Sequence, residues 1–556
     1  MRFSSDHKAI GLHYLWLALL SVFVGMALSL LLRFGFAGAE ARLPWLAEWA
    51  AAPQRNGTLA VLHGSLMVFF VLTAAPQAGF GSYFLPLQIG AREMAFPALS
   101  RLTLWATVIS FAIITSSFFI PAAERGLNLW ITGVALFCLA SLVSAINFTV
   151  TVIDLRGAGM SLPRLPLTVW AWFINALLGM LIFSILLGSV TLLLSDRLAG
   201  THFFSYSVRA FMLAPAAQVP GAFSPVIHQV LWQRLFWFFA QAQVYVAMLP
   251  CFGIVTHLLA TFARRPVWKE RAVVLALCAV GLFGFCIWGE HMFASGLDPY
   301  SPLVFAVLAW SLGLPAAVLL MSWFATLWRA RLQFTTAALF SLGFVALFLT
   351  GGASGVLLAR SDIARAAANS DFVTGHFHLV MGIAATFALL AALFFWFPKM
   401  FGRRLHESLG KVHFWLTFAG VCCVFLPMHW LGLVETSPGS NFHAGDAGVP
   451  ALIPAFILVA MVVTIAVQLI FLGNLLWSLL RGETVAECNP WRATTLEWSV
   501  PSPPPPDDFG ATLPAVYRGA YEFGAPVLPV PAAASGRWVD KDFRPQHLAP
   551  DETAAS

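Results

Sequence analysis

Apolar runs long enough to cross a lipid bilayer recur along most of the chain. A spanning α-helix needs about 20 mainly apolar residues. A soluble fold could not hide so many runs, because 59% of the 556 residues are hydrophobic and only 10% are charged, whereas globular domains have about 45–50% and about 25%. The sequence predicts an all-α integral membrane protein, a bundle of twelve transmembrane helices. The runs are 10–36, 58–87, 102–120, 129–152, 167–194, 235–262, 272–293, 302–327, 335–358, 372–397, 412–433 and 451–480.

Basic residues in the connecting loops predict the topology. With a cytoplasmic N-terminus, loops such as 263–271 (ARRPVWKER) and 399–411 (KMFGRRLHESLGK) lie inside, while the opposite loop 434–450 has no lysine or arginine. That distribution follows the positive-inside rule, so the net charge of +6 reports on topology and indicates no nucleic-acid partner. We expect one transmembrane domain, 1–481. A proline-rich tail, 482–556, is expected to lie along the cytoplasmic face, because it is too poor in core-forming residues to fold alone.

The tenth run carries two histidines, His376 and His378, in the sequence GHFHLVMG. A helix turns about 100° per residue, so the two imidazoles leave it on nearly opposite sides. Ionisable groups inside a membrane are costly and are usually functional; the alternative is two buried histidines bonded to backbone carbonyls. His63 lies in the second run as a third intramembrane histidine. Two imidazoles on one haem iron give a low-spin, saturated centre, and a single imidazole leaves a position open to a gas. Three histidines so placed favour one haem of each kind.

Six segments carry a resemblance to haem–copper oxidase subunit I, and most closely to its cytochrome c oxidase branch. They are DHKAIGLHYL, LHGSLMVFFVLTAAPQAGFGSYF, LFWFFAQAQVYVAMLPCFGIVTHLLATF, IWGEHMFASGLDP, GHFHLVMG and NPWRATTLEWSVPSPPPP, and the match runs in order from residue 6 to 521. The resemblance implies the twelve-helix fold of that subunit in a bacterial-type inner membrane, with both termini cytoplasmic.

The same resemblance implies roles for individual residues. His63 and His378 would bind the low-spin haem, and His376 would be the protein ligand of the high-spin haem. Arg33 matches a position near the low-spin haem, which would be of the A or B type. Phe377, between the ligands, would lie in the short electron path between the two haems.

The chain departs from the family where a copper ion is expected. Three histidines should hold that copper, but the matching residues are Gln241, Glu290 and His291. Copper favours imidazole, whereas amide and carboxylate oxygens favour harder ions such as ferrous iron. This divergent site is interpreted as holding a non-haem iron or a copper, or as holding no metal. Tyr245, four residues after Gln241 on the same helix face, cannot form the oxidase's covalent link to a histidine, and keeps at most a hydrogen-bonding role.

The proton routes of the oxidases are also altered. The glutamate that gates one channel is replaced by Gln243, and the lysine of the second channel aligns with Leu319, so neither position can ionise. Other substituted positions are Ser100 and Arg101 beyond the retained entrance carboxylate Glu93, Ala316, Ala368 and Asn369 at the usual magnesium site, and Pro438 and Gly439 at the usual arginine pair near the propionates.

These observations favour a membrane-bound respiratory terminal oxidoreductase in which nitric oxide, not oxygen, is reduced, without proton pumping. Glu290, Tyr245 and His291 are the predicted catalytic residues. The alternatives are O2 reduction of the cytochrome c oxidase type, a non-catalytic haem electron carrier or sensor, and a transporter. The chain has no CxxCH motif and no cysteine-rich copper site. An electron-entry subunit resembling subunit II, with a copper or haem c centre fed by cytochrome c, is therefore implied; direct quinol oxidation is the other route. The seven cysteines are interpreted as small core residues.

Overall fold

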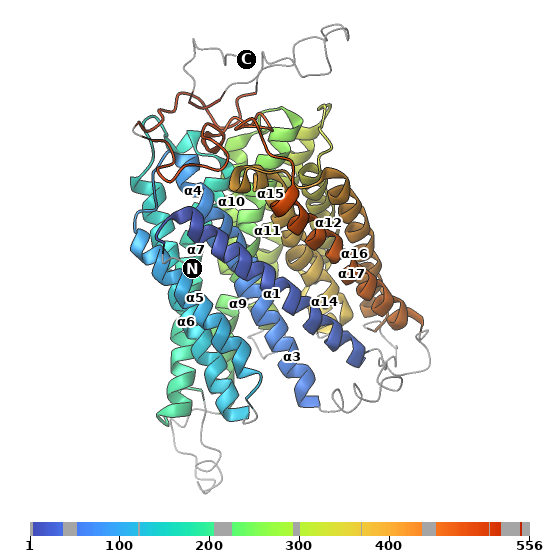
Figure 1. Cartoon of the computed structure of the whole chain (residues 1–556). Coiled ribbons are helices and arrows are strands. Elements are labelled where there is room, and N and C mark those ends of the chain that lie inside the picture. The colour runs from blue at the N-terminus through green and yellow to red at the C-terminus, as the bar shows by residue number, and fades with distance from the viewer. Residues whose placement is uncertain are drawn as a thin grey trace, which may run out of the picture.

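The computed structural model describes residues 4–36, 53–120, 123–204, 225–292, 301–368, 370–435, 452–510, 512–523 and 545–547. These residues form a bundle of long helices with loops at both ends (Figure 1). In the described ranges, eleven helices are long and apolar enough to cross a membrane. Nine are continuous: α1 (His7–Phe36), α5 (Pro97–Ser117), α6 (Ala123–Asp154), α7 (Leu167–Leu198), α9 (Pro225–Ala263), α11 (Ser301–Leu327), α12 (Thr336–Leu358), α16 (Glu407–Glu435) and α17 (Leu452–Arg481). The other two are composite.

The predicted count of twelve spans is not confirmed, and the difference lies in one segment. The run predicted at 272–293 forms α10 (Glu270–Cys286), which has 17 residues, followed by a single 3₁₀ turn, η4 (Glu290–Met292). At 1.5 Å per residue, a helix of that length spans about 25 Å, less than the roughly 30 Å of a bilayer core. Glu290 lies beyond the end of α10, in the 3₁₀ turn.

The two composite spans contain π-helical turns at the places where functional histidines are predicted. The second span joins α3 (Pro53–Ser65), which carries His63, to the π-helix η2 (Leu66–Gly81) and to α4 (Ser82–Ile89). The tenth span joins α14 (Asp371–Phe377) to the π-helix η5 (His378–Ile383) and to α15 (Ala384–Phe401). Because π-turns are frequent at functional sites, their position is consistent with the predicted ligands.

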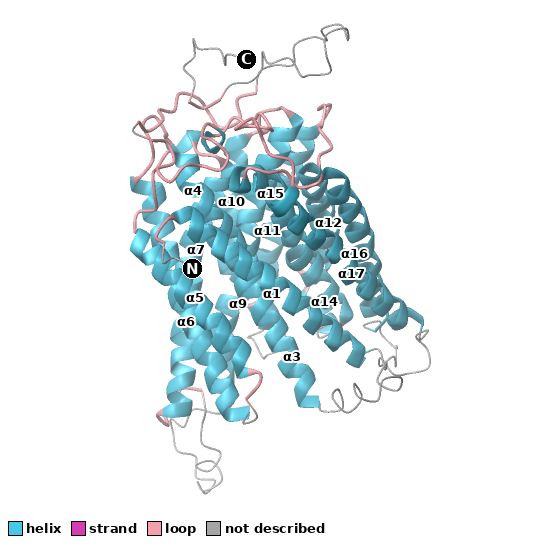
Figure 2. Ribbon diagram, in the orientation of Figure 1, coloured by secondary structure: helices cyan, strands magenta, loops and turns pink. Residues whose placement is uncertain are grey.

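Helix α9 is the centre of the bundle, and α11 and α17 lie at its edge. The most apolar stretch of α9 is wholly buried, whereas only 17% of the corresponding stretch of α11 or of α17 is buried. In Figure 2 the body of the bundle consists of helices, which are joined by loops at its ends. A central helix is the place from which polar side chains can line an internal site.

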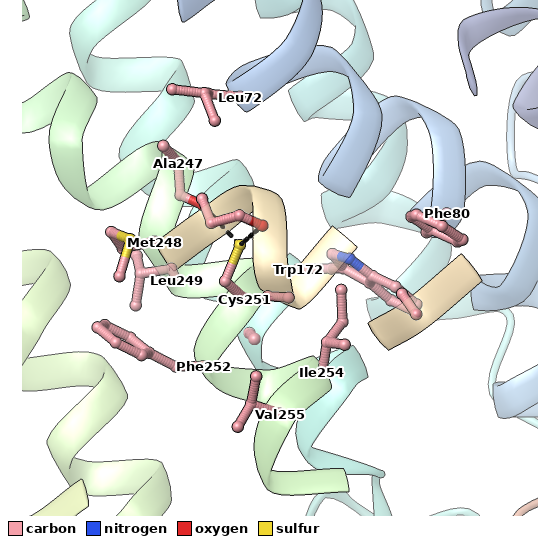
Figure 3. Close-up of a cluster of buried hydrophobic side chains, with 14 of the residues drawn as sticks. Leu72, Phe80, Trp172, Ala247, Met248, Leu249, Cys251, Phe252, Ile254 and Val255 are labelled. Atoms are coloured by element: carbon pink, nitrogen blue, oxygen red, sulfur yellow. Dashed lines mark hydrogen bonds between the residues drawn. The ribbon is translucent and has the colours of Figure 1, made fainter. Parts of the chain in front are cut away.

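The core around α9 includes one cysteine. Cys251 is fully buried among Met248, Leu249 and Phe252, and its thiol points toward the carbonyl oxygens of Ala247 and of α15 (Figure 3). Cys138 is buried as well. The expectation of small core residues is wrong for Cys278, Cys423 and Cys488, which are exposed; all seven cysteines are free.

The described part of the tail after α17 covers one end of the bundle, where α4 and α15 end and α10 begins (Figures 1 and 2). It is anchored by a buried carboxylate, Glu497, which accepts hydrogen bonds from Gln88 Nε2 (3.0 Å) and Trp396 Nε1 (3.4 Å). Tyr521 adds a second anchor, since its hydroxyl accepts a bond from the backbone N–H of Leu167 (3.0 Å). The described part of the tail is therefore held in place by its contacts with the helices.

Candidate functional site

His63 of α3 and His378, at the start of η5, lie next to each other inside the bundle. Their ring centres are 6.4 Å apart and their planes differ by 22°. His63 Nδ1 donates to the carbonyl oxygen of Gly25 (2.9 Å), and His378 Nδ1 donates to that of Thr374 (2.8 Å). A carbonyl can only accept, so each neutral ring carries its proton on Nδ1 and leaves Nε2 unprotonated. Both rings are thus held in the tautomer that binds a metal through Nε2.

His376 contacts a different helix, as its angular separation from His378 predicts. Its Nδ1 lies 3.1 Å from the carbonyl oxygen of Gly351 and 3.0 Å from the hydroxyl of Ser354, both in α12. A methyl group on Gly355, one residue further along α12, would lie 3.0 Å from Cε1 of His376. Small residues on α12 therefore let the ring of His376 pack closely against that helix.

Arg33 contacts the helix that carries His376 and His378, and Phe377 contacts His378. Nη2 of Arg33 is 3.6 Å from Oδ2 of Asp371, and its Nε is buried without a hydrogen-bond partner among the described residues. Asp371 is seven residues before His378, so the two lie on the same face of the helix. The ring of Phe377 meets that of His378 edge to face at 5.8 Å and is 38% exposed.

The structure brings Gln241, Tyr245 and Glu290 together. The side chain of Gln241 interacts with the hydroxyl of Tyr245, and Glu290 is within electrostatic reach of that hydroxyl. Gln241 is 6% exposed, and its Oε1 has no hydrogen-bond partner among the described residues. Gly284 of α10 makes room for the tyrosine, because a side chain there would overlap the ring. A buried amide oxygen with no partner among the described residues suits a cation or a hydrogen-bond donor from outside them.

The remaining member of this predicted set, His291, has its backbone in η4, but its side chain lies outside the described residues. The described part of the chain contains no group of three or more His, Cys, Asp and Glu side chains arranged to hold a metal. Gln241 is not of those types, so the set Gln241, Glu290 and His291 stays a prediction.

Two residues that align with the oxidase proton routes, Gln243 and Leu319, carry an amide and an alkyl side chain. Gln243 is buried, and its Nε2 donates to the hydroxyl of Thr73 (2.6 Å). Thr73 borders a small cavity of about 40 Å³, also lined by Tyr14 and Asn175, which is room for roughly three waters. Leu319 is fully buried in the apolar core. Asn369, Pro438 and Gly439 lie outside the described residues.

Sequence reasoning missed three residues of this region. Asp371 pairs with Arg33, Ser354 contacts His376, and His429 of α16 places Nε2 3.2 Å from the hydroxyl of Ser354. His429 lies in the predicted span 412–433, and an ionisable residue at membrane depth is itself a signal. A serine in a glycine-rich helix gives no such signal.

Comparison with known proteins adds to this geometry. A family model described as cytochrome c and quinol oxidase polypeptide I matches residues 9–466. The chain is 37% identical to the alternative cytochrome c oxidase subunit 1 of Bradyrhizobium diazoefficiens, over 99% of this chain and 93% of the relative. It is 33% identical to cytochrome c oxidase subunit 1 of Synechocystis sp., over 94% and 92%, and of Cereibacter sphaeroides, over 91% and 94%. A solved haem–copper terminal oxidase dimer has a similar fold, with a TM-score of 0.67 at 18% identity, covering 87% of this chain and 85% of that one.

Proposed function

Since the chain belongs to the cytochrome c and quinol oxidase polypeptide I family, as its motifs predict, we propose that it reduces nitric oxide at a rebuilt metal site. It is a membrane-bound terminal oxidoreductase of the haem–copper superfamily, similar to cytochrome c oxidase subunit I. Proteins of this family normally bind haems, and subunit I generally works with subunit II and cytochrome c.

The low-spin haem would be held by His63 and His378. Two metal–nitrogen bonds of about 2 Å each, with roughly 1 Å from each nitrogen to its ring centre, span about 6 Å between ring centres. The distance of 6.4 Å between these rings agrees with that requirement. Both Nδ1 atoms are already bonded to carbonyl oxygens, so Nε2 of each ring would be the atom that binds the iron. The residues fit the group.

The observation that carries the proposal is the oxygen-rich set beside Tyr245. Where the family has imidazoles, Gln241 and Glu290 offer an amide and a carboxylate oxygen, and Gln241 Oε1 is buried without a partner among the described residues. Such donors favour ferrous iron over copper, with His291 as the remaining imidazole. His376 would hold the high-spin haem, and the haem and iron would supply the two electrons.

Protons are the second requirement, because 2 NO, two electrons and two protons give N2O and water. Glu290 can receive and release a proton beside the metal, as a general acid–base group must. The hydroxyl of Tyr245 interacts with Gln241, so its role is to orient that amide. The amide of Gln243 and the alkyl side chain of Leu319 do not ionise, so neither former channel supports pumping.

The electron source is also part of the proposal. A partner resembling subunit II, with a copper or haem c centre, would pass electrons from cytochrome c to the low-spin haem. Phe377, in edge-to-face contact with His378, lies between the ligands of the two haems in the sequence. Arg33, with an unpaired buried Nε, can contact a polar group on the edge of the low-spin haem.

O2 reduction is the second candidate, because relatives that are 33–37% identical over most of their length are named cytochrome c oxidases. A haem carrier or sensor without turnover is the third. Metal and haem analysis of the purified complex separates the three. Two haems and one non-haem iron per chain support nitric oxide reduction; copper at the second site contradicts it and favours oxygen; two haems alone contradict both catalytic functions.

A further inference from the structure

A further histidine, His429, is connected through Ser354 to His376, the predicted ligand of the high-spin haem. His429 of α16 places Nε2 3.2 Å from Oγ of Ser354, and that oxygen is 3.0 Å from Nδ1 of His376. The three side chains come from α16, α12 and α14, so the contacts connect three helices. None of the three is exposed.

The hydrogen bond between His429 and the backbone of Phe425 determines the direction of the other two. His429 Nδ1 lies 2.7 Å from the carbonyl oxygen of Phe425, which can only accept, so the imidazole carries its proton on Nδ1. Nε2 of the neutral ring is then an acceptor, and the hydroxyl of Ser354 is its donor. The oxygen of Ser354 in turn accepts from Nδ1–H of His376, which it shares with the carbonyl oxygen of Gly351 (3.1 Å). The hydroxyl can also reach the carbonyl oxygen of Gly351 (2.8 Å), but that orientation leaves Nε2 of His429 without a donor.

Close packing holds the two histidines in place. A methyl group on Gly375, the residue before His376, would lie 2.7 Å from Nδ1 of His429. The ring of Phe372 meets that of His429 edge to face at 5.1 Å. A larger residue at position 375 would therefore push His429 away from Ser354. Because this residue is glycine, α14 and α16 can approach each other closely.

We propose that Ser354 and His429 form a hydrogen-bond relay that orients His376 and raises its basicity as an axial ligand. The proposal rests on the proposed function, because it takes His376 as the ligand of the high-spin haem. A hydrogen bond to the second nitrogen of a ligating histidine fixes its tautomer and makes it a stronger ligand, and a chain of such bonds polarises each member. A stronger ligand stabilises the oxidised iron, so the relay lowers the reduction potential of that haem. Ser354 and His429 are positioning residues.

The test compares four variants of the purified holo complex. Ser354→Ala removes the hydroxyl, and His429→Phe removes the acceptor. Ser354→Thr keeps a hydroxyl, and His413→Phe is the matched control, because His413 is a buried histidine of the same helix that instead bonds to Gln468 (2.9 Å). The readouts are the iron–histidine stretching frequency of the ferrous high-spin haem and its midpoint potential. Both relay variants are expected to lower the frequency, raise the potential and slow turnover about 10-fold, within the 10–100-fold typical of such partners; Ser354→Thr and His413→Phe stay near the wild type.

Two results would overturn the relay. One is a Ser354→Ala complex that has its full haem content and an unchanged iron–histidine frequency and midpoint potential. This result alone would refute the relay, even if the His429→Phe variant does not fold. The other is a His376→Gly complex that keeps the high-spin haem and its iron–histidine band; that result refutes the ligand itself and, with it, the haem site of the proposed function. Turnover of oxygen in place of nitric oxide, with the frequency shifts present, refutes the proposed substrate and supports the relay.

Discussion

His63 and His378 hold their imidazole rings 6.4 Å apart, centre to centre, with the planes 22° from parallel. Each Nδ1 is bonded to a backbone carbonyl, of Gly25 in one case and Thr374 in the other. The scaffold thus sets both the separation and the tautomer that two axial ligands of one iron need. A pair of structural histidines would need only the carbonyl bonds.

Replacing His378 by leucine should remove the low-spin haem and leave the high-spin haem in place. The reason is that one imidazole cannot saturate the iron, and His376 on the other side of the helix keeps its contacts with α12. Haem extraction should give one haem per chain in place of two, and the sharp low-spin absorption band should vanish. A His378→Leu complex with both haems and an unaltered spectrum would show that this histidine is not a ligand.

Glu290→Gln tests whether the carboxylate moves protons. Glutamine keeps an oxygen donor for a metal but cannot ionise, so iron should stay bound while nitric oxide turnover falls by about 10²–10⁴-fold, the usual contribution of general acid–base catalysis. Turnover is measured together with iron content. Glu487→Gln, at an exposed carboxylate in the tail, is the control. Full activity in an iron-loaded Glu290→Gln complex would exclude this role.

The complex should not pump protons. Gln243 donates through its amide to Thr73 (2.6 Å), and Leu319 is buried among apolar side chains. Neither of these two positions, which are aligned by sequence with the oxidase proton routes, therefore carries an ionisable group. In liposomes with an electron donor outside, turnover should not acidify the external medium. Acidification that a protonophore abolishes would contradict the account.

Burial of Glu497 should make the docking of the tail depend on pH. This carboxylate is fully buried, one of its oxygens has no partner among the described residues, and desolvation raises its pKa above the ordinary 4.5. A raised pKa means that the folded protein holds the proton more tightly than the unfolded chain. The contribution of this group to stability is therefore fully present below about pH 4.5, the ordinary pKa, and is lost as the pH rises through the folded-state pKa.

The variant Glu497→Gln should remove this pH dependence, because an amide keeps an oxygen acceptor for Gln88 and Trp396 without ionising. Glu497→Ala should cost about 1–3 kcal/mol at every pH, since it leaves those donors unpaired. Thermal unfolding of the complex at several pH values between 5 and 8 measures both. A wild-type melting temperature that rises with pH over this range, by an amount that Glu497→Gln abolishes, would have the wrong sign.

Most of the fold could be predicted from the sequence, because membrane-spanning helices follow from the length of apolar runs alone. Eleven of the predicted runs match helices long enough to span a membrane. The run at 272–293 shows the limit of that reasoning. Its hydrophobicity continues to Ile287, but the α-helix ends at Cys286, and Glu290 takes a 3₁₀ turn.

The site was predictable only in part, for a similar reason. The spacing of His376 and His378 gives their opposite directions from helix geometry. Nothing local links Ser354 to His429, or Glu497 to Gln88, because those contacts are set by how distant helices and the tail pack. Asp371 lies one residue before the predicted tenth run, 372–397, and its partner Arg33 comes from α1, far away in the sequence.

The proposed function assigns the reduction of nitric oxide to the site of Gln241, Glu290 and His291. The most direct measurement supplies the purified, reduced complex with isotopically labelled nitric oxide and, separately, with oxygen, and follows both gases and labelled N2O by mass spectrometry. The account predicts steady production of N2O at one molecule per two electrons, and oxygen consumption that is much slower. Rapid four-electron reduction of oxygen to water, with no labelled N2O formed, would contradict it.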